Sequence, residues 1–451
     1  MPARGTMLTG LTARGNNMRV HGLPLPKDIP TLPGMLAEAG YRTHSVGKLH
    51  IQPWQDTKGI DAADLETVED NPERRVHWQA DRITRAPDNY YGFQTQDMVV
   101  GHGTYSFIGG DYAMWLKEHA PEEAAKYQGF GTMDVDPAVH YNTWIADRSI
   151  DFIDAQSDEQ PFFLWCSFPD PHTPFSAVRK YAEMYNAADM PVSPVALDPP
   201  ESAQSKTLEE ANAGRRTNCD LHEATRQIFG MMTHIDDEVA RVLDCLERQG
   251  MRENTVVIFI ADHGEQLGEH DAMHKGVWPY DGSTRIPFIV HVPWADAAPR
   301  GRTVDTPVSQ IDLVPTVLDL AGVAQPEDPR STPEHREAFQ FPPSLPGESL
   351  ARVLTEGGEP ERGCALVEWN VNNTRKNELL QIRTLVTREY KLAVFAPTGE
   401  MLLFDRKKDP LETTNIVHHP AYREIVTDML VRMVNELGRT EPRIPRQFSG
   451  C

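Results

Sequence analysis

The stretch Thr255-Val-Val-Ile-Phe-Ile-Ala-Asp-His-Gly-Glu265 decides how this chain folds. Residues 256–261 form a continuous apolar run, which is typical of a strand in a parallel sheet that is covered on both faces. The run ends abruptly in Asp262, His263 and Gly264, and Lys275 follows thirteen residues after the aspartate. Metal ligands and anion-binding groups of open α/β sheets lie at the carboxyl ends of strands, so a functional site is predicted here.

The composition is ordinary for a globular protein and excludes some classes of function. Apolar residues make up 39% and charged residues 24% of the 451 positions. The net charge of −22 argues against a nucleic-acid partner, because phosphate backbones attract clustered Lys and Arg. No apolar run approaches the roughly 18 residues that a membrane-spanning helix needs, so no transmembrane segment is expected. The sequence leaves the oligomeric state open.

The five cysteines predict neither a zinc site nor a disulfide framework. They are scattered, odd in number and contain no Cys-x-x-Cys pair. Cys166 and Cys245 fall in apolar strand and helix patterns, where buried free thiols are common. This usage favours a reducing, cytoplasmic location over a periplasmic or secreted one.

Helix and strand patterns alternate along most of the chain, which predicts an α/β domain. We expect helices at 31–40, 144–153, 222–249 and 309–320, and strands at 41–50, 162–168, 255–261 and 286–292. Residues 52–140 and 187–216 are polar and weakly patterned, and we interpret them as loops that shape a substrate cleft.

The pattern changes after a Pro-rich stretch at 325–346. Four short strand patterns lie at 365–369, 382–387, 390–395 and 401–404, and one helix pattern follows at 421–437. This order predicts a small antiparallel sheet with one packed helix. We therefore expect a catalytic α/β domain over residues 1–345 and an α+β subdomain over 346–451.

Polar residues follow three of the predicted strands. The first strand ends in Gly47-Lys48-Leu49-His50, where period-two geometry places Lys48 and His50 on one face. The second is followed by Asp170-Pro171-His172-Thr173-Pro174, and the third by Asp262-His263-Gly264. Strand ends that meet at one sheet edge would form a catalytic cleft on rigid elements.

Five short motifs resemble those of one enzyme family, in the same order. They are Pro2-Ala3-Arg4-Gly5-Thr6-Met7-Leu8-Thr9-Gly10, Val46-Gly47-Lys48-Leu49-His50, Pro171-His172-Thr173-Pro174, Ala261-Asp262-His263-Gly264, and Phe404-Asp405 with Asp409-Pro410-x-Glu412-x-x-Asn415. Together they resemble the sulfatase branch of the alkaline phosphatase superfamily over nearly the whole chain. The resemblance implies an alkaline-phosphatase-like mixed, mostly parallel sheet flanked by helices, with the small C-terminal antiparallel subdomain.

The resemblance also implies roles for individual residues. Arg4 would stabilise the nucleophile, and Lys48 and Lys275 would bind the non-bridging oxygens of the ester. His172 is the candidate acid for the leaving group, and His50 would steady the nucleophile or assist breakdown of a covalent intermediate.

Asp262 and His263 are the implied ligands of one divalent metal. A carboxylate beside an imidazole fits Ca²⁺ less well than an Asp-Asn pair does, and it also admits Mn²⁺, Mg²⁺ or Zn²⁺. The family's nucleophile is a formylglycine made from the Cys of Cys-x-Pro-x-Arg. Counting back from Pro2, that position falls before Met1, so we expect the nucleophile and an acidic first strand upstream of this chain, which would then be truncated.

The resemblance predicts a sulfuric ester hydrolase that acts on a small-molecule or saccharide sulfate ester. Phosphate or phosphonate monoester hydrolysis by the same residues is the first alternative, because both substrates are tetrahedral oxyanions. A catalytically inactive fragment or pseudoenzyme that only binds an anion or a partner is the second.

Overall fold

The chain forms two compact units in the computed structural model, and each is described by itself. The structure describes residues 1–54, 71–101, 103–127, 129–157, 160–197, 220–295, 297–298, 300–325, 345–373, 378–396 and 398–441. The first unit holds Met1–Leu32 and the described chain from Val256 onward. The second unit holds Pro33–Leu197 and the described chain from residue 220 to Thr255.

A three-stranded parallel sheet organises the second unit. Its strands β1 (Arg42–Gly47), β2 (Thr95–Met98) and β3 (Phe162–Ser167) have the order β2-β1-β3. Gly47 is opposite Ser167 in the register, so β1 and β3 end at the same edge of the sheet. The segments that carry Lys48 and His172 therefore leave the sheet at that edge. Strand β1 ends at Gly47 and His50 has a φ of +55°, so the period-two placement predicted for Lys48 and His50 does not apply.

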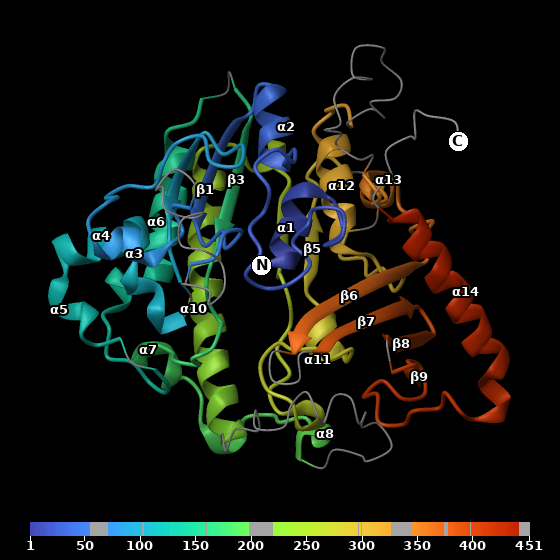
Figure 1. The fold of residues 1–451 in the computed structure, drawn as a ribbon. Helices are drawn as coiled ribbons and strands as arrows, with labels where there is room; N and C mark the ends of the chain where they lie inside the picture. Colours follow the sequence, from blue (N-terminus) through green and yellow to red (C-terminus); the bar gives the residue numbers. More distant parts are fainter. Residues whose placement is uncertain are drawn as a thin grey trace. The chain divides into compact units, whose positions relative to one another are not determined.

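Two long helices accompany this sheet (Figure 1). Helix α6 (Tyr141–Asp154) contacts β1 and β3, and α10 (Leu221–Arg248) packs on α6. Helix α10 begins at Asp220, whose carboxylate accepts hydrogen bonds from two backbone N–H groups of the first turn. The other helices are α2 (Leu32–Glu38), α3 (Arg75–Gln79), α4 (Gly110–His119), α5 (Pro121–Ala124), α7 (Arg179–Ala182) and α8 (Pro194–Leu197).

The apolar core of the second unit lies between the sheet and its helices. Val46 of β1, Tyr141 and Ile145 are fully buried there, and Trp144 is almost so. Helix α6 thus buries an apolar stripe against β1, and burial of such large side chains is the main source of stability.

The first unit contains the strand that the Asp-His-Gly sequence ends. Strand β4 (Val257–Ile260) pairs with β5 (Phe288–His291), and this pair is antiparallel. Among the described strands β4 has no pairing with β1 or β3, so strand pairing brings only two of the three predicted strand ends to one edge. The apolar run predicted a strand of a parallel sheet covered on both faces, and this prediction is wrong for the described residues. Three residues of β4 are partly buried, and Phe259 is 43% exposed. Apolar content does not specify which strand is the neighbour.

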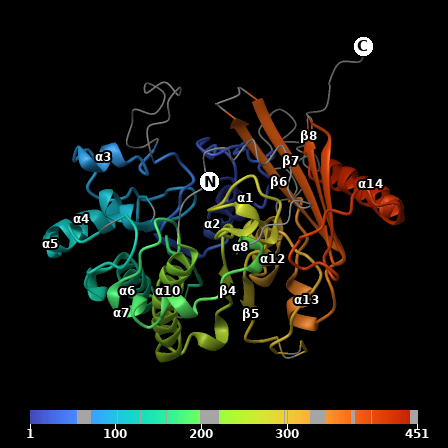
Figure 2. The ribbon, with the colours of Figure 1, turned by 90° about the horizontal axis from the view of Figure 1, so that it is seen from below.

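A four-stranded antiparallel sheet forms the C-terminal part of the first unit. The strands β6 (Cys364–Asn373), β7 (Glu378–Thr387), β8 (Tyr390–Ala396) and β9 (Glu400–Asp405) pair in sequence order. Helix α14 (Arg423–Arg439) packs on one face through Met429 and Met433. The other face packs on residues 272–280, which lie in the segment after β4, so the sheet separates two small cores (Figure 2).

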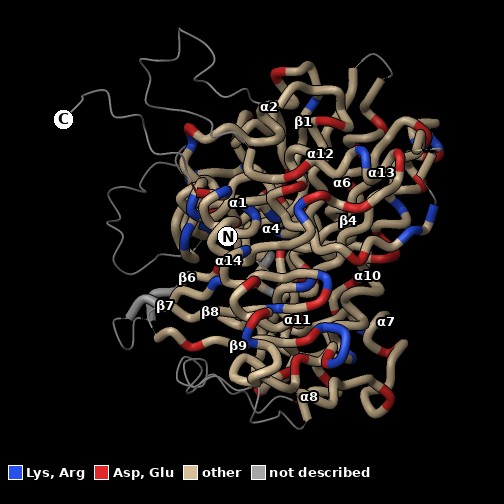
Figure 3. The backbone as a smooth tube through the Cα atoms, turned by 90° about the vertical axis from the view of Figure 1, so that its right-hand side faces the viewer, with Lys and Arg blue, Asp and Glu red and all other residues tan. Residues whose placement is uncertain are grey.

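Shorter helices complete the first unit. They are α1 (Pro2–Thr9), α11 (Asp281–Thr284), α12 (Leu313–Leu320) and α13 (Ala351–Glu356), with 3-10 turns at Glu269–Asp271 and Gln310–Asp312. Helix α1 contacts α12 and the second of these turns. No helix within the described ranges has the length and apolar content for a bilayer crossing. Basic and acidic side chains are interspersed along the chain (Figure 3).

Most predicted elements are present with small shifts of their ends. The two stretches interpreted as loops are exceptions. The stretch 52–140 contains α3, α4 and α5 and contributes β2 to the parallel sheet, and the stretch 187–216 contains α8. Strand β2 is four residues long, Thr-Gln-Asp-Met, and too short and polar for a periodic signal. Residues 55–70, 198–219 and 326–344, with Cys219 and Cys451, lie outside the described residues. The boundary between residues 345 and 346 stays a prediction.

Gly47 occupies a position that no other residue fits. Its φ is +93° and a Cβ atom would lie 2.1 Å from the Ser167 carbonyl oxygen. Gly40 has a φ of +92° but no atom within 4 Å of such a Cβ, so it isolates the cost of φ alone. We expect Gly40→Ala to lower the free energy of unfolding by about 1 kcal/mol, and Gly47→Ala by at least about 3 kcal/mol. Urea titration measures both, and equal losses would contradict the steric argument.

Candidate functional site

An ion pair at the end of β4 holds the first candidate residue. Arg4 Nε donates a hydrogen bond to Asp262 Oδ2 at 2.7 Å. The side chains of Arg4 and Asp262 are 8% and 20% exposed, so the pair is largely removed from water. A buried carboxylate is costly unless it is paired, and Arg4 supplies the compensating charge.

Local structure on both sides sets the geometry of this pair. Helix α1 has Pro2 in its first turn and ends at Gly10, whose φ of +69° is left-handed, and both features suit helix ends. On the other side, Gln310 Nε2 donates to the backbone oxygens of Ala261 and Asp262 at 3.1 and 3.0 Å. The backbone of the strand end is therefore held by hydrogen bonds.

Gly264 lets the chain pass close to helix α11. A Cβ atom at this position would lie 2.1 Å from the Gly282 carbonyl oxygen, and Gly264 N donates to Ser283 O at 3.0 Å. The glycine of the Asp-His-Gly sequence is thus required by a backbone approach that any side chain would block.

His263 presents one ring nitrogen toward Asp262. Its Nδ1 lies 2.8 Å from the Gly264 carbonyl oxygen, which can only accept, so Nδ1 carries the proton. In the neutral ring Nε2 then carries the lone pair that a cation would need. This nitrogen is 3.6 Å from Asp262 Oδ1, while Arg4 binds the other carboxylate oxygen.

Lys275 belongs to the same electrostatic cluster. Burial lowers its pKa, the carboxylates of Asp262 and Glu265 oppose this shift, and Arg4 adds to it. The structure therefore brings together Arg4, Asp262, His263 and Lys275, the four predicted residues of the first unit. Arg4 and Lys275 are the two cations of this cluster, and Asp262 and Glu265 are its two carboxylates.

The donor chemistry fits part of a divalent-metal site. Asp262 Oδ1 and His263 Nε2 could occupy two coordination positions of one cation. Within the described ranges, no three His, Cys, Asp or Glu side chains gather as a metal-binding group. Further ligands would have to come from other groups, so the pair is a partial site.

The predicted residues of the second unit follow β1. Lys48 is 4% exposed, and its backbone N–H donates to Ser167 O at 3.0 Å, which extends the β1–β3 ladder by one residue. His50 is 7% exposed and has a φ of +55°, uncommon for a residue other than glycine. Both side chains are buried at the edge where the two strands end.

Asp170 is a buried carboxyl group beside Lys48 and was not among the predicted site residues. Its oxygens accept hydrogen bonds from the Tyr141 hydroxyl and from Asn142 Nδ2, at 2.8 Å for the amide. Burial raises its pKa to about 7, opposed by these hydrogen bonds and by Lys48. His172, two residues on, is half-buried, and its Nδ1 lies 2.5 Å from the Thr173 carbonyl oxygen.

Glu73 holds the loop that contains His50. Glu73 Oε1 accepts hydrogen bonds from the backbone of Ile51 and Gln52, both at 3.1 Å, and the backbone of His50 also donates to this carboxylate. Burial raises the pKa of Glu73 to about 7. Nothing in the polar stretch around Glu73 distinguishes it in sequence, because its partners are backbone groups brought to it by folding.

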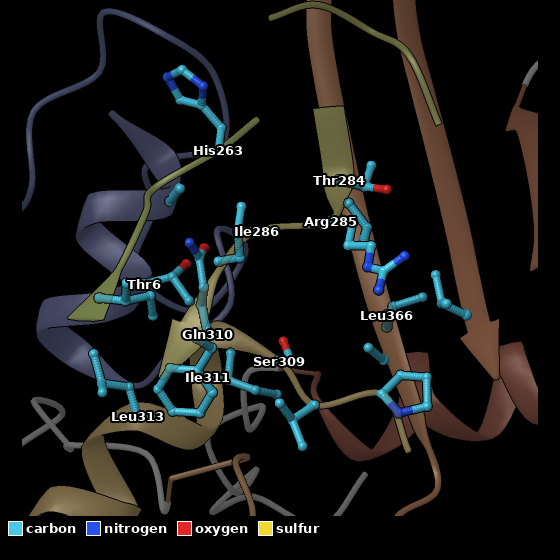
Figure 4. A pocket seen from close by; sticks show the side chains of 18 of the residues that line it. Thr6, His263, Thr284, Arg285, Ile286, Ser309, Gln310, Ile311, Leu313 and Leu366 are labelled. Atoms are coloured by element: carbon cyan, nitrogen blue, oxygen red, sulfur yellow. The ribbon is translucent and has the colours of Figure 1, made fainter. Parts of the chain in front are cut away.

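A cavity of about 1410 Å³ adjoins the first group of residues (Figure 4). Asp262, His263 and Lys275 line it, as do Arg285 and Trp369. It exceeds the roughly 300–1,000 Å³ typical of small-molecule pockets. Arg285 contributes a cationic group and Trp369 an aromatic group to the wall of the cavity.

Comparison with known proteins identifies the family. The sequence model of the sulfatase family matches residues 1–323. The chain belongs to the sulfatase family, whose members are sulfuric ester hydrolases. This sulfatase is 27% identical over 422 residues to an arylsulfatase of Clostridium perfringens, covering 91% of this chain and 79% of that protein. It is 29% identical over 448 residues to the uncharacterised sulfatase YidJ of Escherichia coli, covering 95% and 75%.

Solved structures confirm the alkaline-phosphatase-like fold. The phosphonate monoester hydrolase of Agrobacterium radiobacter has a TM-score of 0.73 at 22% identity and covers 97% of this sulfatase and 86% of its own chain. A protein solved with its substrate D-glucosamine-2-N,6-O-disulfate has a TM-score of 0.69 at 19% identity, with coverage of 98% and 89%. The predicted fold class and family are thus confirmed, whereas the roles of individual residues stay predictions.

The raised pKa values of Asp170 and Glu73 predict how stability depends on pH. Both groups bind protons more tightly in the folded than in the unfolded chain, so stability is lost as pH rises from about 4 to about 7. Asp170→Asn removes one of the two groups and should reduce this loss, by up to about 4 kcal/mol.

Urea titrations at pH 4.5, 6 and 7.5 measure this pH dependence. Asp151→Asn, a change on the exposed side of α6, is the matched control. An unchanged pH dependence in Asp170→Asn would mean that Asp170 is ionised throughout this range.

Proposed function

We propose that this sulfatase hydrolyses a sulfate monoester, with Arg4, Lys275, Lys48, His50 and His172 as its catalytic residues. The observation that carries the proposal is the paired and oriented Asp262 at the end of β4, with His263 and Lys275 beside it. This arrangement combines metal donors with cations. Both can stabilise the negative charge of the transition state in which the ester bond is cleaved.

Each group contributes by its charge or by a proton. Lys275 offsets the negative charge that grows on the non-bridging oxygens, and burial strengthens this effect because little water screens it. Arg4 keeps one Asp262 oxygen occupied and so turns the other toward His263. His172 is assigned to protonate the leaving oxygen, and the contact of its Nδ1 with the Thr173 carbonyl orients the ring.

The nucleophile and the metal are not among the described groups. In the family, a formylglycine hydrate supplies the nucleophile and a divalent cation polarises the ester. Asp262 and His263 would hold that cation. We propose that the formylglycine precedes Pro2 by two positions, which places it outside the 451 residues.

The cavity next to Lys275 supports a saccharide as the organic part of the ester. Arg285 offers a guanidinium for a second anionic group, and Trp369 offers an aromatic surface for a sugar ring. A neighbour in fold was solved with a disulfated glucosamine, and a 23% identical relative is a choline-sulfatase of Rhizobium meliloti.

Hydrolysis of a phosphonate or phosphate monoester is the second candidate. A relative from Trinickia caryophylli, 25% identical over 473 residues, is a multifunctional alkaline phosphatase superfamily protein. The Asp262–His263 pair also admits metals other than calcium, which a phosphonate hydrolase could use.

Replacement of the two lysines tests both the residues and the reaction. In the longer protein that carries the proposed formylglycine, Lys275→Ala and Lys48→Ala should each lower kcat/KM for p-nitrophenyl sulfate by about 100-fold or more. If both stabilise one transition state, the double variant should lose less than the product of the single losses. Lys117→Ala, at an exposed lysine of α4 that does not line the cavity, is the control.

The same variants should be assayed on p-nitrophenyl phenylphosphonate. A wild-type kcat/KM higher for this ester than for the sulfate would favour the second candidate. Losses no larger than that of Lys117→Ala would remove the assigned roles. If the longer protein with its formylglycine turned over neither ester, anion binding would remain as the function.

The position of the nucleophile is tested by mass. In protein isolated from its native host, we expect a peptide that extends beyond Met1 and carries an aldehyde two residues before Pro2. Peptide mass spectrometry with and without an aldehyde-reactive hydrazide measures this. A native protein that begins at Met1 would contradict the proposed nucleophile.

A further inference from the structure

A buried ionic cluster in the first unit has no role in the proposed chemistry. Lys391 has no exposed surface, and its Nζ contacts both the Asp281 and the Glu412 carboxylates. Glu412 is 3% exposed, and its Oε2 accepts a hydrogen bond from the Asp281 backbone N–H at 2.8 Å. We call Lys391, Asp281 and Glu412 the triad.

The triad joins three distant parts of the sequence. Lys391 lies near the start of β8, Glu412 follows β9 in the C-terminal motif, and Asp281 is the first residue of α11. Burial raises the pKa of Glu412, whereas at Asp281 the attraction of Lys391 outweighs burial and lowers the pKa. Removing Lys391 would leave two buried carboxylates without their shared cation. Changing Glu412 alters both a contact of Lys391 and the acceptor of the Asp281 backbone N–H.

Helix α11 connects the triad to the strand end of the candidate site. Two residues after Asp281, the Ser283 carbonyl accepts the hydrogen bond from Gly264 N, and the Gly282 carbonyl occupies the space that a side chain at 264 would need. Gly264 directly follows His263. Lys391 is therefore connected to the candidate metal ligands through α11 and its two backbone contacts with Gly264, one from Gly282 and one from Ser283.

The segment between Gly264 and Ser283 forms a loop whose ends meet. It carries Lys275, and its far side packs on the C-terminal sheet through Trp278 and Tyr280. The His270 ring stacks on Tyr280 with centroids 3.7 Å apart. The triad is the polar anchor of this loop, and the aromatic contacts are its apolar anchor.

We propose that Lys391, Asp281 and Glu412 are positioning residues that hold the loop 264–283, and through it Asp262, His263 and Lys275. The mechanical part of this proposal stands on the contacts alone, and its effect on turnover rests on the proposed function. A charge cluster that served only general stability would have no particular effect on this loop.

Hydrogen exchange separates these two roles without any assay of activity. In the full-length protein, Glu412→Gln keeps the shape and removes one charge of the triad. We expect amide exchange in peptides from 263–283 to become at least about fivefold faster, with α14 and α12 unchanged. Lys408→Met, which removes the exposed lysine that pairs with the largely buried Asp405, should leave exchange in that loop unchanged.

Two results would overturn the proposal. One is unchanged exchange in residues 263–283 of Glu412→Gln, and the other is equally faster exchange across the first unit, which indicates global destabilisation. Lys391→Met is the stronger variant, and Glu412→Gln keeps the test valid if Lys391→Met does not fold.

Turnover of p-nitrophenyl sulfate gives the second readout. Glu412→Gln should lower kcat by about tenfold with little change in KM, because misplaced groups cost rate more than binding. Absence of turnover in the wild-type protein that carries the upstream formylglycine would count against the proposed function and leave the exchange result intact. Faster exchange without a loss of kcat would restrict the triad to loop stability and overturn its link to the site.

Discussion

A buried carboxylate at the end of an apolar strand constrains the rest of the candidate site. Asp262 follows β4 with little access to water, and an uncompensated charge there would cost several kcal/mol. Arg4 provides the compensation, which requires α1 to lie where its guanidinium can reach. Gln310 satisfies the backbone oxygens of the same turn. One electrostatic requirement thus determines where α1 and the turn before α12 must lie.

Close backbone approaches are the second constraint, and they recur in both units. Gly47 meets the Ser167 carbonyl and Gly264 meets that of Gly282, each where a strand gives way to functional residues. At each of these positions a side chain would collide with a neighbouring backbone carbonyl, so only glycine allows the chain to leave the sheet there. The glycines of both motifs are therefore explained by geometry and not by chemistry.

Buried charge is compensated differently in the two units. Around Asp170 and Glu73 the burial penalty is met by raised pKa values and by neutral hydrogen-bond donors. Around Asp262 and in the triad it is met by cations, which keep Asp281 ionised. The first solution makes stability sensitive to pH, whereas the second keeps charges in place for binding an anion.

The sequence by itself determined the family, the fold class and most elements. Long apolar runs, helical spacing and five ordered motifs carry that information locally. Four predicted residues do come together at Asp262, and two of the three strand ends share an edge. The short polar strand β2 was missed because four residues carry no period.

Only the tertiary structure decided which groups support the site. Glu73, Asp170 and Gln310 act through backbone groups or partners 21 or more residues away, as does the triad through α11. It also decided that β4 pairs with β5 and not with β1 or β3 among the described strands. The physical reason is the same in each case. A local pattern states what a residue can bind, but folding selects its partner from groups that are far apart in the chain.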